Sequence, residues 1–430
     1  MKKLALSLVI TSLIAAPAMA DEAALLAKIE ALSAQVEALK KEVKSLHSQT
    51  EAIATQQEAA STPTTAATQT TNDSGKREDT GATLWGYGEV NYTRPTDDSS
   101  QTQMDLRRAV FGIGYKFNES TRFVSEFEVE HAIASADDAG EMEVEQFYID
   151  HQLTPNTHLK AGLFLIPAGL LNESHEPTRY YGVERNFVET AIIPSTWREG
   201  GLAFFGTTDN GLAWDAGVTT TVNLGNWDAS SEEGRESPLG SIHQELQLAK
   251  ASDLGVYGAL NYRAIPGFVV GGSLFTSKVA QDNSDLTLAQ DSRMTLWDIH
   301  SRWTPGNWDL SALYARGTIS DTKALNLTFA GFPTPIPKEF FGWYAQAAYK
   351  VWQNGDYQLS PFVRYEGVNT AAEYEAMPLG LGVAAASTEH ITTLGASFYI
   401  SPQVVFKLDY QDFDQDSARN RFNLGLGLAF

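Results

Sequence analysis

Charged side chains are concentrated in one stretch of the sequence, between Pro167 and Trp197. They are Glu173, His175, Glu176, Arg179, Glu184, Arg185 and Glu189, and Arg198 follows directly after the stretch. Carboxylates that face guanidinium groups across a narrow space set up a field that orients dipolar molecules and discriminates by charge. The alternative is that these groups pair with one another and only fix a long loop. The sequence leaves both interpretations open for the cluster, and pairing is the simpler one for any single residue.

The rest of the sequence gives no indication of catalysis. It has no G-x-S-x-G motif, and its His, Asp and Glu residues lack the spacing of a metal site. It contains no cysteine, which excludes disulfides and thiol chemistry, and its net charge of −22 argues against a nucleic-acid partner. We therefore expect neither an enzyme nor a cofactor or metal.

The N-terminus has the pattern of a secretory signal peptide over residues 1–20. Lys2 and Lys3 precede an apolar run, and Ala18-Met19-Ala20 resembles a cleavage site. The run is too short for a spanning helix, which needs about 20 residues. The sequence therefore predicts an exported protein.

A heptad pattern follows and predicts a coiled-coil helix over residues 21–53. Its apolar seam consists of Leu25, Ile29, Leu32, Val36, Leu39, Val43 and Leu46. The alternative is a single amphipathic helix packed on a domain. Residues 54–82 are polar and aperiodic, as in a linker.

From residue 83 to residue 430 the apolar residues alternate with polar or small ones, which predicts strands. The last strand shows this best, with Phe422, Leu424, Leu426, Leu428 and Phe430 on one face and small or polar residues on the other. Seven short turns alternate with eight long connections, and so join sixteen strands. Long loops at one rim and short turns at the other are typical of transmembrane barrels. We predict an all-β fold, a sixteen-stranded antiparallel transmembrane β-barrel.

This prediction gives the charged stretch a position. It becomes the third long connection, and the alternation directs Arg108, Lys116, Arg122 and Lys160 toward the barrel interior. An even strand number also places both chain ends on the periplasmic side, so the helical segment would be periplasmic.

Several segments resemble the phosphate-selective porin O/P family. They are DLRRAVFG at residues 105–112, which contains Arg107 and Arg108, KAGLFLIPAGL at 160–170, ERNF at 184–187 and PSTWREGGL at 194–202. The resemblance covers roughly residues 83–430. It implies a trimeric, sixteen-stranded porin whose third loop folds into the lumen.

These observations predict an outer-membrane porin of a Gram-negative bacterium for passive diffusion of small hydrophilic solutes or ions. The expected partners are outer-membrane lipid, the solutes, two further copies of the chain and an envelope partner for the coiled coil. One alternative is a structural anchor that tethers the envelope through its coiled coil, and another is a barrel enzyme acting on lipids.

The balance of charge predicts a weak preference for cations over phosphate. Residues 81–430 carry 43 acidic and 23 basic side chains, whereas anion selection needs basic residues at the narrowest ring. The opposing possibility is a local basic ring of Arg107, Arg108, Arg122 and Lys160.

Overall fold

The computed structural model describes residues 81–135 and 138–430. The expected signal peptide, the coiled-coil seam and all but the end of the polar linker lie outside the described residues. Those three assignments therefore stay predictions.

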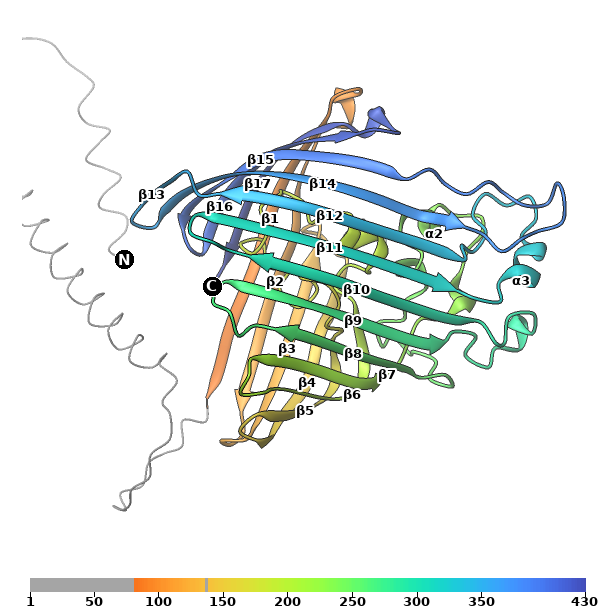
Figure 1. Cartoon of the computed structure of the whole chain (residues 1–430), viewed down its shortest axis with the longest axis horizontal. Coiled ribbons are helices and arrows are strands. Elements are labelled where there is room, and N and C mark those ends of the chain that lie inside the picture. Colours follow the sequence, from red (N-terminus) through yellow and green to blue (C-terminus); the bar gives the residue numbers. More distant parts are fainter. Residues whose placement is uncertain (1–80, 136–137) are drawn as a thin grey trace, which may run out of the picture. The chain divides into compact units, whose positions relative to one another are not determined.

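The described chain forms a barrel of antiparallel strands (Figure 1). Its strands are β1 (Ala82–Pro95), β2 (Gln103–Lys116), β3 (Thr121–Glu130), β4 (Met142–Thr154), β5 (Thr157–Leu165), β6 (Arg198–Thr207), β7 (Leu212–Thr219), β8 (Gly255–Tyr262), β9 (Phe268–Lys278), β10 (Arg293–Trp303), β11 (Trp308–Ile319), β12 (Glu339–Tyr349), β13 (Trp352–Asn354), β14 (Tyr357–Glu373), β15 (Glu389–Ser401), β16 (Val404–Phe413) and β17 (Arg421–Ala429). The short β13 continues β12, because both pair with β14. The barrel therefore has sixteen strand positions around its circumference, each called a stave, with β12 and β13 counted as one.

The first and last strands close the barrel. β1 pairs with β17 from Tyr87↔Ala429 to Pro95↔Arg421, and β1 also pairs with β2. The predicted sixteen-stranded antiparallel barrel is confirmed.

Alternation along the strands separates an outer face of exposed apolar residues from a buried inner face. On β17, Phe422 and Leu424 are exposed, whereas Asn423 between them is fully buried. On β2, Phe111 is exposed and its neighbour Val110 is buried. An outer surface of large exposed apolar residues is the face that a barrel presents to lipid.

Exposed aromatic residues gather at the short-turn end of several neighbouring strands. They are Trp303, Trp308, Tyr349, Trp352 and Tyr357. Tryptophan and tyrosine favour the membrane–water interface because their rings are apolar and carry one polar group. These residues form part of an aromatic girdle at this rim.

Short turns and long loops occupy opposite ends of the barrel (Figure 1). Gly211, Gly306 and Gly355 have positive φ in three of the short turns, a conformation that glycine adopts without strain. The short helices α2 (Glu233–Glu236) and α3 (Lys323–Thr328) lie in long connections. Among the described residues, no helix has the length and apolar character needed to cross a membrane.

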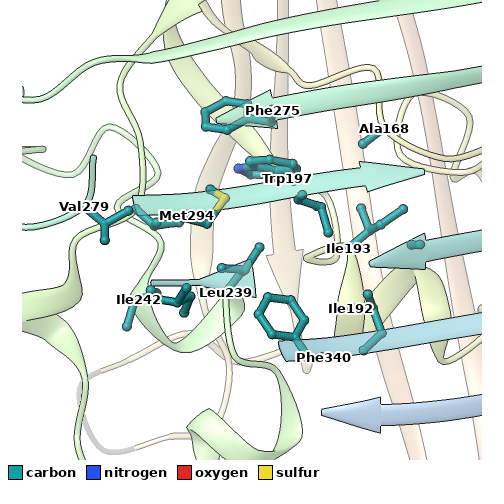
Figure 2. Close-up of a cluster of buried hydrophobic side chains, with 14 of the residues drawn as sticks. Ala168, Ile192, Ile193, Trp197, Leu239, Ile242, Phe275, Val279, Met294 and Phe340 are labelled. Carbon is teal, nitrogen blue, oxygen red and sulfur yellow. The ribbon is translucent and has the colours of Figure 1, made fainter. Parts of the chain in front are cut away.

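An apolar core fills part of the barrel interior (Figure 2). Ile192, Ile193 and Trp197, from the third long loop, belong to one buried cluster with Leu239 and Ile242 from the loop between β7 and β8. Inward side chains of β9, β10 and β12 also belong to it, among them Phe275, Met294 and Phe340. Burial of these side chains stabilises the second half of the third loop inside the barrel.

Candidate functional site

The third loop, residues 166–197, leaves β5 and returns to β6 with its two ends bound together. The Asn172 amide donates hydrogen bonds to the carbonyl oxygens of Ile166 (2.7 Å) and Trp197 (2.8 Å). The Trp197 N–H donates to Asn172 Oδ1 at 2.7 Å. The intervening residues therefore form an excursion from a closed base.

Glu189 strengthens this base from the π-helical turn η2 (Val188–Ile192). One of its carboxylate oxygens accepts the N–H groups of Leu170 and Leu171, at 2.6 and 2.7 Å. The other accepts from the Asn186 amide and the Tyr344 hydroxyl. Burial raises the pKa of Glu189, and these hydrogen bonds act in the opposite direction. Four donors for one carboxylate indicate a structural role for this predicted site residue.

The excursion reaches the stave opposite its origin. β14 lies eight staves from β5 in the order of the closed barrel. The Phe187 N–H donates to Glu366 Oε2 on β14 at 2.8 Å, and Arg364, paired with Glu366, contacts the carbonyl oxygen of Arg185. The third loop therefore crosses the barrel interior.

A second set of contacts binds the middle of the loop to β16. Lys407 Nζ donates to the carbonyl oxygen of Gly182 at 2.8 Å, and Asp409 accepts the Val183 N–H at 2.6 Å. Lys407 Nζ also lies 3.6 Å from the ring centroid of Tyr180, a cation–π contact.

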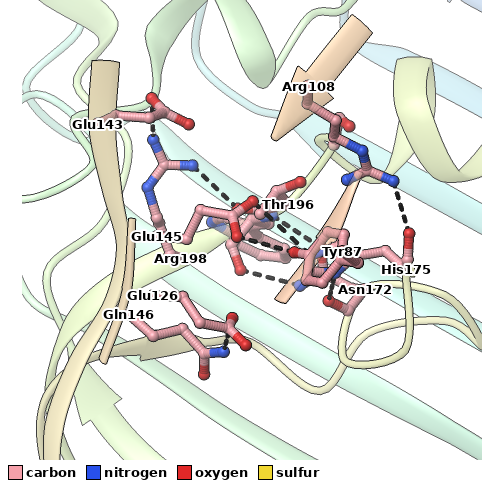
Figure 3. A network of polar contacts seen from close by, with 12 residues as sticks. Tyr87, Arg108, Glu126, Glu143, Glu145, Gln146, Asn172, His175, Thr196 and Arg198 are labelled. Atoms are coloured by element: carbon pink, nitrogen blue, oxygen red, sulfur yellow. Dashed lines mark hydrogen bonds and ion pairs between the residues drawn. The ribbon is translucent and has the colours of Figure 1, made fainter. Parts of the chain in front are cut away.

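A third set joins the loop to β1 and β2 (Figure 3). Glu89 accepts from Arg108 Nε and from the Tyr180 hydroxyl, both at 2.7 Å. Arg108 Nη2 donates to the carbonyl oxygen of His175 at 2.6 Å. Burial and the Glu89 carboxylate raise the pKa of the Tyr180 hydroxyl, which therefore stays a donor.

The contacts among His175, Tyr87 and Glu145 require one proton more than a neutral histidine, a tyrosine and an ionised glutamate carry together. His175 Nδ1 lies 2.8 Å from the Asn172 carbonyl oxygen, which only accepts, so Nδ1 carries hydrogen. The Tyr87 hydroxyl contacts both His175 Nε2 (2.6 Å) and Glu145 Oε2 (2.9 Å) but has a single proton. The second contact therefore needs a proton on His175 Nε2 or on Glu145.

Most of the predicted wall bases are paired with acids. Arg108 binds Glu89, Arg122 binds Asp150 at 2.6 Å, and Lys160 binds Asp215 at 2.6 Å. Arg198 binds both Glu143 (2.5 Å) and Glu245 (2.8 Å).

Arg107 occupies a bulge, because β1 pairs Glu89 with Arg108 and Val90 with Leu106. Three members of the considered basic ring are thus neutralised, and only Arg107 lacks a paired acid among the described contacts.

The remaining loop residues differ in their surroundings. Glu184 accepts from Asn91 on β1, and Arg185 donates to Ser195 and Thr196. Glu176 and Arg179 approach only to 3.8 Å at a partly exposed position. Glu173 lines a cavity together with residues of β5 to β8.

Two groups of interior residues were not assigned to the site from the sequence. Arg364, Lys407 and Asp409 contact the third loop but lie far from it in sequence, so alternation identifies their face and not their partner. One carboxylate oxygen from each of Glu128, Glu143 and Glu145 lies within 4.8 Å of the other two, an arrangement that could hold a cation. Only the pairing of β3 with β4 brings these acids together.

The chain forms a closed sixteen-stave barrel with an apolar exterior and a charged interior, and its third long loop crosses that interior. This is the architecture of the outer-membrane porins. The family model "Phosphate-selective porin O and P" matches residues 80–423. A protein of Aquifex aeolicus (strain VF5), named only "Uncharacterized protein", is 31% identical over 343 residues, which are 77% of this chain and 75% of that protein. The chain belongs to the phosphate-selective porin O and P family.

Solved porins share this fold at low sequence identity. Salmonella typhi OmpF in complex with daunomycin aligns with a TM-score of 0.57 and 14% identity, over 82% of this chain and 98% of that chain. An anion-selective porin from Comamonas acidovorans gives 0.51 and 11%, over 82% and 100%. The channel DcaP of Acinetobacter baumannii gives 0.50 and 11%, over 81% and 97%. Family and fold together support an outer-membrane channel for solutes or ions.

Proposed function

We propose that the chain is a passive diffusion porin for small hydrophilic solutes and ions, and that the third loop sets its size limit. The observation that carries this proposal is the set of contacts from the third loop to β14, β16 and β1. A loop bound to staves on several sides of the lumen reduces the area that is open to solutes. Its carboxylates and guanidinium groups then border the permeation path.

We propose a weak preference for cations. The pairing of Arg108, Arg122, Lys160 and Arg198 with acids supports it, because an acid beside each base cancels much of the attraction for anions. The excess of acidic residues in the barrel then decides the sign of the field. Arg107 acts only over the Debye length, about 8 Å at physiological salt.

Planar-bilayer recording of the purified full chain tests both statements. We expect stepwise currents, and a reversal potential across a KCl gradient with the sign of K⁺ permeation. Glu184→Gln should lower the cation preference and the matched variant Arg185→Gln should raise it, each with little change in conductance. A silent protein would favour the structural anchor, and a reversal potential of anion sign would show that a basic ring dominates.

We also propose a homotrimer in the outer membrane, with the N-terminal segment in the periplasm and available to an envelope partner. The family supports three copies, whereas β-branched a positions with leucine at d favour two strands in isolated coils. Tethering to a trimeric barrel raises the local concentration of the helices and favours three.

Native mass measurement of the detergent-extracted chain should give three copies. Deletion of residues 21–60 should leave the trimer intact but dissociating at a lower temperature. A monomer or dimer from the full chain would contradict the proposal.

A further inference from the structure

A cavity of about 270 Å³ lies inside the barrel between the third loop and the short-turn end. Pro167 and Glu173 of the third loop border it on one side, and Asn156, from the turn between β4 and β5, borders it near the rim. Inward residues of β5 to β8 complete the wall. The cavity therefore lies on the short-turn side of the third loop.

Most charged groups around the cavity already have partners. Both oxygens of Asp215 are used, one by Lys160 Nζ (2.6 Å) and the other by the Tyr257 hydroxyl (2.8 Å). His158 contacts Asp150 at 2.7 Å. These groups shape the wall and leave little charge for a ligand.

Two lining residues of opposite charge remain. Within residues 81–135 and 138–430, neither the Glu173 carboxylate nor the Arg263 guanidinium has a hydrogen bond or an ion pair, although both line the cavity. The Glu173 carboxylate interacts electrostatically with Lys160, Asp215 and Arg263, in decreasing order of strength. The Phe205 ring, stacked on His158 with centroids 5.0 Å apart, adds an apolar surface beside them.

We infer that this cavity is a binding site for small zwitterionic solutes, with the ammonium group at Glu173 and the carboxylate at Arg263. The inference rests on the proposed channel function and adds a solute class to it. A zwitterion satisfies both unpartnered charges at once, whereas a simple anion or cation satisfies one and is repelled by the other. The volume is slightly below the roughly 300 Å³ of the smallest common ligand pockets, which suits a molecule of amino-acid size.

The test compares β-alanine with its uncharged isomer lactamide as inhibitors of the ion current through the full chain in planar bilayers. We expect β-alanine to reduce the current saturably and lactamide to change it only as viscosity does. Glu173→Gln and Arg263→Gln should each raise the half-inhibiting β-alanine concentration about tenfold. The exchanged pair Glu173→Arg with Arg263→Glu should recover most of the effect, and Asp356→Asn, in a short turn that does not line the cavity, should behave like the wild type.

The outcomes separate this inference from the proposed function. Equal effects of the two isomers, or an effect of β-alanine that neither substitution weakens, would overturn the zwitterion site while the channel stands. If the wild-type protein carries no ion current, the proposed channel function is overturned, and the zwitterion site with it.

Discussion

Excision of residues 173–187 should raise the single-channel conductance several-fold. This segment carries the contacts of His175, Tyr180, Val183 and Phe187 with β1, β2, β14 and β16, and its removal would open the lumen that the loop now crosses. The excision is compatible with the fold, because the Glu189 carboxylate accepts hydrogen bonds from the N–H groups of Leu170 and Leu171, at 2.6 and 2.7 Å. These bonds keep the two ends of the segment close together. A Gly-Gly link would join them.

The apolar anchor of the loop survives this change, since Ile192, Ile193 and Trp197 remain in the buried cluster. A matched control removes residues 97–101 from the first long connection, which should leave the conductance unchanged. Heat-modifiable migration in gels verifies that each variant still forms a barrel. Wild-type conductance from a folded excision variant would refute the inward constriction.

The barrel was predictable from the sequence because its strands obey a simple period. Alternation such as that of Phe422 and Leu424 with Asn423 directly gives the lipid and lumen faces. The sorting of short and long connections then gives the orientation of the strands. Such patterns are local and need no knowledge of the partners.

The candidate site was predictable only in part, because its contacts join residues far apart in the sequence. The inward positions of Arg108 and Lys160 follow from alternation, but their neutralisation by Glu89 and Asp215 depends on the register between strands. Glu189 looked like one more loop charge, and its four donors appear only once the loop is folded.

Arg364 and Lys407 show the same limit from the side of the wall. Nothing in their own strands indicates that a loop more than 160 residues earlier would contact them.

The central claim, that the third loop borders the permeation path, is tested most directly by thiol modification of one loop residue during recording. The chain has no cysteine, so Arg179→Cys introduces a unique target at an exposed charge of the loop. A bulky cationic methanethiosulfonate reagent should reduce the current in steps, one for each modified pore, and a reducing agent should restore it. Ser100→Cys, exposed in the first long connection, should react without a change in current. If mass measurement shows complete modification of the Arg179→Cys variant and the current is unchanged, the third loop does not border the permeation path.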